Sequence, residues 1–260
     1  MSNGEHLILD GLTVARGARD VVRRVTIEVT PGEVTALLGP NGAGKSSMVL
    51  AVGGVLPMKA GSVKLGDREL AGRRPERIRR AGLAIVPEGR RLLPELSVED
   101  NLKVATYSLS GDRASSGRQR ALEMFPELQK RLSTQARALS GGEQQMVVLA
   151  QALVSEPKFV IIDELSLGLA PVVVQRLIPT IRTVTEAGIG VLLIEQFAAV
   201  ALGLANRAYV MEGGRIQYSG TAQELKDKPD LLHSAYLLRG GGETPGVPLT
   251  APNESLPTNG

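Results

Sequence analysis

The apolar and polar positions predict β structure at the start of the chain. Residues 7–14, 21–29 and 34–38 form apolar-rich runs, and Pro31-Gly32 supplies turn residues between the second run and the third. Short runs of this kind, bounded by turn residues, are typical of strands. We therefore expect three strands before the first glycine-rich segment.

Further along, short apolar runs alternate with segments of helical spacing. The predicted strands cover residues 62–65, 83–86, 159–162 and 190–194, with a hairpin over 208–218 around Gly213-Gly214. Three helices are predicted between these strands. The first begins at Gly44, the second covers residues 75–81 and starts with proline, and the third covers residues 172–187. Strands that alternate with helices predict a doubly wound α/β core around a parallel sheet.

Residues 97–155 interrupt this alternation because their pattern is mostly helical. The sequence Ser97-Val-Glu-Asp is a capping pattern for the start of a helix. Residues 121–132 carry apolar positions at mixed helical spacing in spite of Pro126. We therefore expect a helical subdomain inserted into the sheet domain.

The first chemical motif is a phosphate cradle between the 34–38 strand and a helix-capable segment. Its glycines let the backbone curl so that N–H groups and a helix N-terminus point at phosphate oxygens. Lys45 adds a positive charge, and Ser46 can offer its hydroxyl to Mg²⁺. A structural glycine turn is the alternative when the motif is taken alone. The predicted nucleotide-binding residues are Gly39, Pro40, Asn41, Gly42, Ala43, Gly44, Lys45, Ser46 and Ser47.

A pair of acids follows the apolar run at 159–162, which suits a central parallel strand buried on both faces. Ligands of open α/β sheets bind at the carboxyl ends of such strands. Asp163 is placed to hold the Mg²⁺ shell, and Glu164 to orient or deprotonate an attacking water. A solvated turn is the alternative, and the cradle earlier in the chain disfavours it.

A third motif, LSGGEQQ at residues 139–145, is predicted to open a helix with Ser140 as its N-cap. An ordinary capped helix is the alternative reading of this stretch. However, a hydroxyl, two glycines and a helix N-terminus make a second anion site, which one chain with one cradle does not need. We therefore expect a second protomer to use it.

In order and spacing, these motifs resemble the ATP-binding cassette ATPases, from about residue 7 to residue 238. The resemblance implies a P-loop NTPase of the α/β class with a RecA-like core, an N-terminal antiparallel β subdomain and an inserted helical subdomain at about 97–155. One ATPase domain would then cover residues 1–238. Residues 239–260 are predicted to form a disordered tail, because they contain few large apolar side chains.

The resemblance also assigns roles across two subunits. In that family two ATPase domains pack head to tail, and each nucleotide lies between one cradle and the other subunit's signature. Ser140, Gly141 and Gly142 would therefore contact the nucleotide of the opposing domain. The cofactors implied are ATP and Mg²⁺. The implied catalytic residues are Glu164, Lys45 and Gln196, and the implied metal-binding residues are Ser46, Asp163 and Glu88.

Shorter strings are similar to those of branched-chain amino-acid importer ATPases of the LivF type. They cover residues 86–91, 96–102, 166–171 and 193–196. Most cassette ATPases have Gln at the position of Glu88, Asp at Ala170 and His at Gln196. The LivF-type subfamily shares all three departures, so they support the narrower resemblance.

Two other positions depart from the family pattern. Arg16 stands where an aromatic side chain usually stacks on adenine, and Leu165 replaces the proline that usually follows the catalytic glutamate. An arginine guanidinium can also stack on a purine, so we keep Arg16 as a candidate adenine contact. The alternative is that Arg16 points to solvent.

Composition narrows the function classes. The 260 residues are 43% hydrophobic, which is ample for a core, and the absence of cysteine excludes disulfides and thiolate metal sites. No apolar run approaches the roughly 18 to 20 residues that span a bilayer, and no signal segment is visible. We therefore expect a cytoplasmic protein that is peripheral on the inner face of the cell membrane through its partners.

A nucleic-acid surface must be considered because the net charge is +3 and arginines gather within residues 68–80. Aromatic residues, on which single strands stack, make up only 3% of the chain. A solvated basic face is the favoured interpretation, and no nucleic-acid partner is expected.

The resemblance therefore predicts an ATP-hydrolysing subunit that energises an ABC importer, with branched-chain amino acids as the first expected solute. The implied partners are membrane permease subunits, a second ATPase subunit that is a copy or a sibling, and indirectly an extracytoplasmic solute-binding protein. The alternatives are an importer of urea, amides or other small solutes, a cassette ATPase acting on nucleic acid or ribosomes, and a catalytically silent structural subunit.

Overall fold

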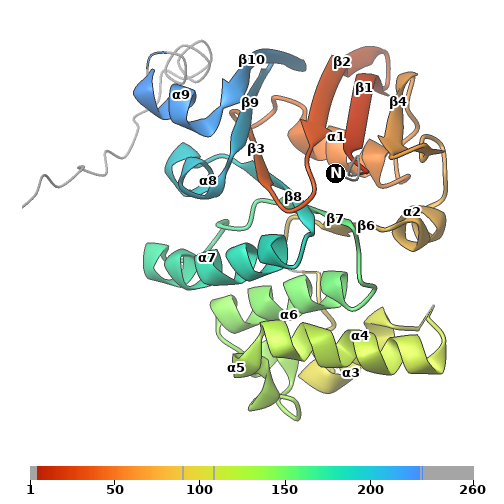
Figure 1. Ribbon diagram of the computed structural model, residues 1–260, viewed down its shortest axis with the longest axis vertical. Coiled ribbons are helices and arrows are strands. Elements are labelled where there is room, and N and C mark those ends of the chain that lie inside the picture. The colour runs from red at the N-terminus through yellow and green to blue at the C-terminus, as the bar shows by residue number, and fades with distance from the viewer. Residues whose placement is uncertain (1–4, 90, 108, 229, 231–260) are drawn as a thin grey trace, which may run out of the picture.

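The computed structural model describes residues 5–89, 91–107, 109–228 and 230, and it stacks β sheets against layers of helices (Figure 1). The fold class predicted from the sequence is confirmed. The predicted tail at 239–260 lies outside the described residues.

The central sheet has six strands, and five of them are parallel. The strand order is β10-β9-β3-β8-β7-β6, with β10 antiparallel to β9. The strands are β3 (Val34–Leu38), β6 (Leu83–Val86), β7 (Phe159–Asp163), β8 (Gly190–Glu195), β9 (Arg207–Glu212) and β10 (Arg215–Thr221). Because β8 lies between β3 and β7, it separates the strand before the cradle from the strand that ends in the acids.

A second, antiparallel sheet is built from the start of the chain and from the strands that follow the first helix. Its order is β2-β1-β4-β5, formed by β1 (Leu7–Arg16), β2 (Arg19–Val29), β4 (Ala60–Leu65) and β5 (Arg68–Glu69). The N–H of Arg23 donates to the carbonyl of Gly214 at 2.7 Å, which joins this sheet to the β9-β10 turn.

Helices cover both faces of the central sheet. Helix α1 contacts β1, β2 and β7, whereas α6 contacts β6 and α8 contacts β3 and β8. Figure 1 shows α7 and α6 on the side of the sheet away from α1, with α3, α4 and α5 beyond them. The helices are α1 (Lys45–Val52), α2 (Pro75–Ala81), α3 (Val98–Ala105), α4 (Gly111–Met124), α5 (Pro126–Gln129), the 3-10 helix η1 (Ala136–Ala138), α6 (Gly141–Leu153), α7 (Pro171–Glu186), α8 (Ala198–Leu204) and α9 (Ala222–Asp227).

The central strands are apolar at successive positions because both of their faces are buried. On β7, Val160 and Ile162 belong to the core beneath α6 and α7, whereas Phe159 and Ile161 belong to the core shared with α1 and the antiparallel sheet. This alternation is the period-two geometry of a strand buried on both sides. Within the described residues, no helix is both long enough and apolar enough to cross a membrane.

The helical layer differs from the sequence prediction at residues 121–132. Helix α4 ends at Met124, and α5 begins at Pro126. Phe125 between them has an extended φ of −128° and a fully buried ring. Proline lacks the N–H that a continuous helix needs and disfavours helical geometry in the residue before it. The helical periodicity was therefore real, but it belongs to two helices.

Helix α4 approaches the end of α6 closely at one glycine. A Cβ atom at Gly117 would lie 2.0 Å from the carbonyl oxygen of Val154. We predict that Gly117→Ala lowers the free energy of unfolding by about 1 to 3 kcal/mol, because backbone must move to admit the methyl group. The matched change Gly111→Ala, at the exposed start of the same helix, is expected to be neutral or slightly stabilising, since nothing lies within 4 Å. Urea unfolding midpoints measure both, and equal midpoints would contradict the prediction.

Candidate functional site

The residues predicted to bind nucleotide gather at the carboxyl ends of three adjacent strands. Leu38 at the end of β3 pairs with Glu195 on β8, and Asp163 at the end of β7 pairs with Ile194 on β8. The cradle therefore begins two strands away from the acid pair, on the same edge of the sheet. This is the edge at which open α/β sheets bind their ligands.

The cradle is shaped by backbone that only glycine tolerates. Gly44 precedes α1 with φ of 108°, and a Cβ atom there would lie 2.4 Å from the carbonyl oxygen of Val21. Helix α1 has no side-chain cap and no acidic residue in its first turn. The N–H groups of that turn therefore have neither a capping side chain nor a nearby carboxylate of their own helix, which suits an anion.

Lys45 is held at the mouth of the loop. Its Nζ donates to the carbonyl oxygens of Gly39 at 2.7 Å and Pro40 at 3.1 Å, and only 4% of the residue is exposed. Burial lowers the pKa of Lys45, while the neighbouring charges of Glu164 and Asp163 act in the opposite direction. The ammonium is therefore a preorganised charge next to the start of α1, facing the acids.

Asp163 is a buried carboxylate at the end of β7. It is 4% exposed, and its Oδ1 has no hydrogen-bond partner among the described residues. Burial raises its pKa to about 6, and the charges of Glu164 and Glu88 add to this, whereas Lys45 and the hydroxyl of Ser46 lower it. A buried carboxylate oxygen without a donor is a suitable ligand for a cation.

These features fit Mg²⁺. A magnesium ion in a nucleotide site usually takes one or two protein ligands, the substrate phosphates and water. Ser46, at the exposed start of α1, and Asp163 can supply a hydroxyl and a carboxylate. The described residues contain no group of three or more acidic, histidine or cysteine side chains able to hold a metal by themselves.

Glu164 lies at the edge of the same site in an unusual backbone conformation. Its φ is 53°, which side chains other than glycine rarely adopt, and its N–H donates to the carbonyl of Ile194 at 2.9 Å. Burial raises the pKa of Glu164, and Glu88 adds to the effect. Backbone strain of this kind persists only where the surrounding contacts hold it, and it is concentrated at functional sites, where it fixes the direction of a side chain.

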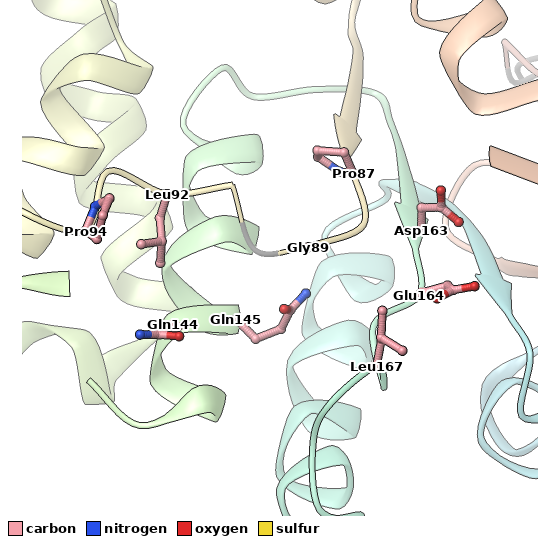
Figure 2. Close-up of a pocket in the computed structure, with 9 residues that line it drawn as sticks. All are labelled: Pro87, Gly89, Leu92, Pro94, Gln144, Gln145, Asp163, Glu164 and Leu167. Atoms are coloured by element: carbon pink, nitrogen blue, oxygen red, sulfur yellow. The ribbon is translucent and has the colours of Figure 1, made fainter. Parts of the chain in front are cut away.

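A cleft of about 420 Å³ adjoins the acids (Figure 2). Figure 2 shows Asp163 and Glu164 at the end of β7, while Gln145 projects from α6 into the intervening space. The cleft thus separates the acid pair from the helical layer. Its lining residues are Pro87, Gly89, Leu92, Pro94, Gln144, Gln145, Asp163, Glu164 and Leu167.

Gln144 and Gln145 of the LSGGEQQ motif line this cleft, but Ser140, Gly141 and Gly142 of the same motif do not. Ser140 is the exposed N-cap of α6, and its Oγ accepts the N–H of Glu143 at 3.3 Å while Glu143 accepts the N–H of Ser140 at 2.8 Å. Gly141 and Gly142 form the first turn, and Gly142 packs against Val173. Ser140 is therefore exposed, while its side chain takes part in the capping box of its own helix with Glu143.

The three other predicted site residues, Glu88, Gln196 and Arg16, follow or end different strands and differ in exposure. Glu88 is exposed after β6, yet its charge raises the pKa values of Asp163 and Glu164, so it faces the site. Gln196 follows β8 and is half-buried. Arg16 is exposed at the end of β1.

Of the cradle residues, Asn41, Gly42 and Ser46 are exposed and Ser47 is half-buried, whereas Ala43 is buried and its carbonyl accepts the N–H of Gly214 at 2.9 Å.

Sequence reasoning missed the buried Glu195, whose side chain accepts two hydrogen bonds from Ser166. The available signal was a single acid directly after the apolar run of β8. It marks a strand end in the same way as Asp163 does.

A sequence profile described as ABC transporter matches residues 22–166. The chain belongs to the ABC transporter family. Among its ABC relatives, the high-affinity branched-chain amino acid transport ATP-binding protein BraG of Pseudomonas aeruginosa is 39% identical over 89% of this chain and 99% of its own length. The probable branched-chain amino acid transport ATP-binding protein LivF of Archaeoglobus fulgidus is 32% identical over 77% of this chain and 86% of its own length.

A solved structure shares the ABC fold. It is described as the ATP binding subunit of an ABC transporter, is 31% identical, and superposes with a TM-score of 0.75 over 89% of this chain and 98% of the other. The match spans the central sheet, the antiparallel sheet and the helical layer together, because nearly all of both chains is covered. The family predicted from the sequence motifs is thus confirmed.

The raised pKa of Asp163 predicts a cost in stability at neutral pH. Its ordinary pKa is 3.8 and its folded value is about 6, so between these values the folded protein holds a proton that the unfolded chain has lost. Stability relative to Asp163→Asn therefore falls as the pH rises through this window and levels off above pH 6. Without nucleotide and Mg²⁺, we expect Asp163→Asn to be more stable than wild type by about 1 to 3 kcal/mol at pH 7.5.

Denaturant unfolding between pH 7.5 and pH 5 measures this difference, which is expected to shrink toward pH 5. Asp112→Asn, on the exposed start of α4, serves as the control and is expected to show no such trend. A stability difference that does not change with pH would contradict the burial of a charged Asp163.

Proposed function

We propose that this chain is the ATP-hydrolysing subunit of an ABC importer for branched-chain amino acids, and that it works as one half of an ATPase dimer. The observation that carries the proposal is the meeting of Lys45, Asp163 and Glu164 at one edge of the central sheet. The similarity to BraG and to the archaeal LivF protein, both named for branched-chain amino acid transport, supports the choice of solute.

Each residue then has a defined task toward ATP. The first-turn N–H groups of α1 and the ammonium of Lys45 bind the β- and γ-phosphates. Ser46 and Asp163 would hold Mg²⁺, which when bound neutralises charge on the phosphates. Glu164 accepts a hydrogen bond from water and orients it in line with the γ-phosphate. Gln196 and Glu88 flank the site from the ends of β8 and β6.

The second half of each site comes from a neighbouring subunit. Ser140 is exposed at the start of a capped helix, Gly141 after it is half-buried, and both lie outside the cleft of their own chain, so another molecule can reach them. We propose that they bind the γ-phosphate held by the partner's cradle. Arg16 would lie near the adenine of the ATP in its own chain's cradle. Closure of the dimer excludes water from the site, and loss of the γ-phosphate removes the contact that joins the halves.

Coupling to transport would run through the segment between β6 and α3. Gly89, Leu92 and Pro94 line the cleft beside the acids, and the same segment leads into the helical layer. Leu93, Val104 and Tyr107 are 42%, 51% and 93% exposed, which gives this end of the layer apolar side chains for a partner. We propose that a helix of the membrane permease docks there and follows closure of the dimer.

The experiment that tests this function is co-purification from membranes. We expect the tagged full-length chain to bring down two permease subunits and a second ATPase subunit, and ATP turnover of the complex to rise with a branched-chain amino acid and its binding protein. If urea or an amide stimulates ATP turnover and branched-chain amino acids do not, the proposed solute is wrong and the importer role remains. Recovery of RNA or DNA without a permease would reject the transport role.

We predict that Glu164→Gln binds ATP like wild type but turns it over at least about 100-fold more slowly in the assembled complex, because an amide cannot act as the base or accept equally well from water. Steady-state phosphate release and nucleotide binding measure the two effects. Glu186→Gln, at the exposed end of α7, is the control. Wild-type turnover in Glu164→Gln would remove the water-orienting role from this residue.

We predict that Ser140→Arg leaves ATP binding to the isolated chain unchanged but reduces turnover of the complex by about tenfold or more, since the bulky side chain blocks dimer closure. The control is Ser115→Arg, which adds the same side chain to the exposed face of α4. If Ser140→Arg weakens nucleotide binding in the isolated chain, the residue serves its own cradle and the shared-site arrangement is wrong.

A further inference from the structure

Glu195 is the most deeply buried carboxylate near the site, and the mechanism above gives it no task. It ends β8, the strand between the cradle strand β3 and the acid strand β7, and only 1% of it is exposed. Its register partner on β3 is Leu38, directly before the cradle. The side chain is thus placed between the two parts of the nucleotide site.

The carboxylate of Glu195 binds one residue with both oxygens. Oε1 accepts the backbone N–H of Ser166 at 2.9 Å, and Oε2 accepts the Ser166 hydroxyl at 2.7 Å. Ser166 is itself 7% exposed. Among the residues that the structure describes, no lysine, arginine or histidine forms an ion pair with Glu195. The hydrogen bonds from Ser166, a backbone hydrogen bond from Gln196 and the charge of Lys45 therefore offset the burial of the Glu195 charge.

Ser166 lies two residues beyond Glu164, in the segment whose backbone is strained. Glu164 has φ of 53°, and its own N–H donates to Ile194 at 2.9 Å. Leu165 is fully buried, but unlike a proline it does not fix its own φ. On the far side of Glu164, the N–H of Leu167 donates to the carbonyl of Glu164 at 3.3 Å, and Ser166 is bound by Glu195. Residues of β8 therefore bind the segment both at Glu164, through Ile194, and beyond it, through Glu195.

We propose that Glu195 is a positioning residue for ATP hydrolysis, which holds Glu164 in its left-handed conformation by binding Ser166 with both carboxylate oxygens. The inference rests on the proposed function, since it assigns to Glu195 the orientation of the residue that positions water. Glu195 does not touch the substrate in this account. It acts through Ser166 and the backbone of the intervening Leu165.

The chemistry of the pair explains why a carboxylate is retained at a buried position. Apolar residues of similar volume often stabilise a core as well as a buried charge does, because a buried charge loses its hydration. A side chain with two acceptors at fixed separation, however, can accept the N–H and the hydroxyl of one serine together. The carboxylate therefore fixes the position of the serine. Such positioning matters because small displacements at a reacting group lower the reaction rate by large factors.

Two substitutions separate positioning from packing. Glu195→Met keeps an unbranched side chain of similar length but removes both strong acceptors. Glu195→Gln keeps one acceptor for the N–H and offers a donor to the serine oxygen. In the assembled complex we expect Glu195→Met to lower kcat by about tenfold or more with KM for ATP nearly unchanged, and Glu195→Gln to retain most of the wild-type rate.

Glu224→Met is the matched control. Glu224 also accepts a backbone N–H, that of Thr221 at 3.0 Å, but it is exposed and lies at the start of α9, far along the chain from the acids. Its loss removes a helix cap and is expected to leave kcat unchanged. A similar fall of kcat in Glu224→Met and Glu195→Met would mean that general destabilisation explains both.

Hydrogen exchange of the backbone amides of residues 164–166 tests the same contact without any turnover. We expect faster exchange of these amides in Glu195→Met than in wild type, and wild-type exchange in Glu195→Gln. If the wild-type complex hydrolyses no ATP, the proposed function fails, while the exchange result still decides whether Glu195 holds this segment. Wild-type kcat together with wild-type exchange in Glu195→Met would overturn the proposal. An equal loss of kcat in Glu195→Gln and Glu195→Met, in step with a lowered Tm, would also overturn it.

Discussion

The gathering of buried charge at the carboxyl edge of one parallel sheet is the constraint on which the rest of the structure depends. Lys45, Asp163 and Glu195 are each less than 5% exposed, and the strands that carry or precede them are neighbours in the sheet. Burial lowers the pKa of Lys45 and raises those of Asp163 and Glu195. Each group is thus placed where its charge is costly unless a group of opposite charge, or a bound ion, lies close by.

This constraint explains several features that look unrelated along the chain. The glycines of the cradle let the backbone carbonyls reach the ammonium of Lys45, and the strained Glu164 keeps a second carboxylate at the rim. The raised pKa of Asp163 predicts that this arrangement lowers the stability of the folded chain, as is common where a site is built for a ligand that neutralises it. ATP and a cation would complete the charge balance from outside the chain.

The sequence predicted most of this framework. The strand before the cradle, the strand that ends in the acid pair and the N-cap Ser140 follow from local patterns that need no partner elsewhere in the fold. The break at Phe125 was not predicted, because helical periodicity continued across Pro126. The start of α4 at Gly111 was also missed, since this helix is held by packing on α6 rather than by its own apolar pattern.

Contacts in the site between residues far apart in the sequence could not be predicted from local patterns either. Glu195 and Ser166 are 29 residues apart, and their contact follows from the register of β7 against β8. Asp163 Oδ1 has no hydrogen-bond donor among the described residues, and this too depends on how the fold places distant groups. A motif names the residues that bind phosphate, but only the assembled sheet shows how the buried charges constrain one another.

If each chain contributes half of every ATP site, turnover must depend on subunit concentration, and this dependence is the most direct test of the arrangement. ATP turnover per chain is to be measured as the full-length protein, alone and with its co-purified ATPase partner, is diluted through the range in which sedimentation detects association. With shared sites, we expect turnover per chain to rise with concentration and to reach a plateau as dimers form. A full turnover rate per chain at dilutions where only monomers sediment would contradict it.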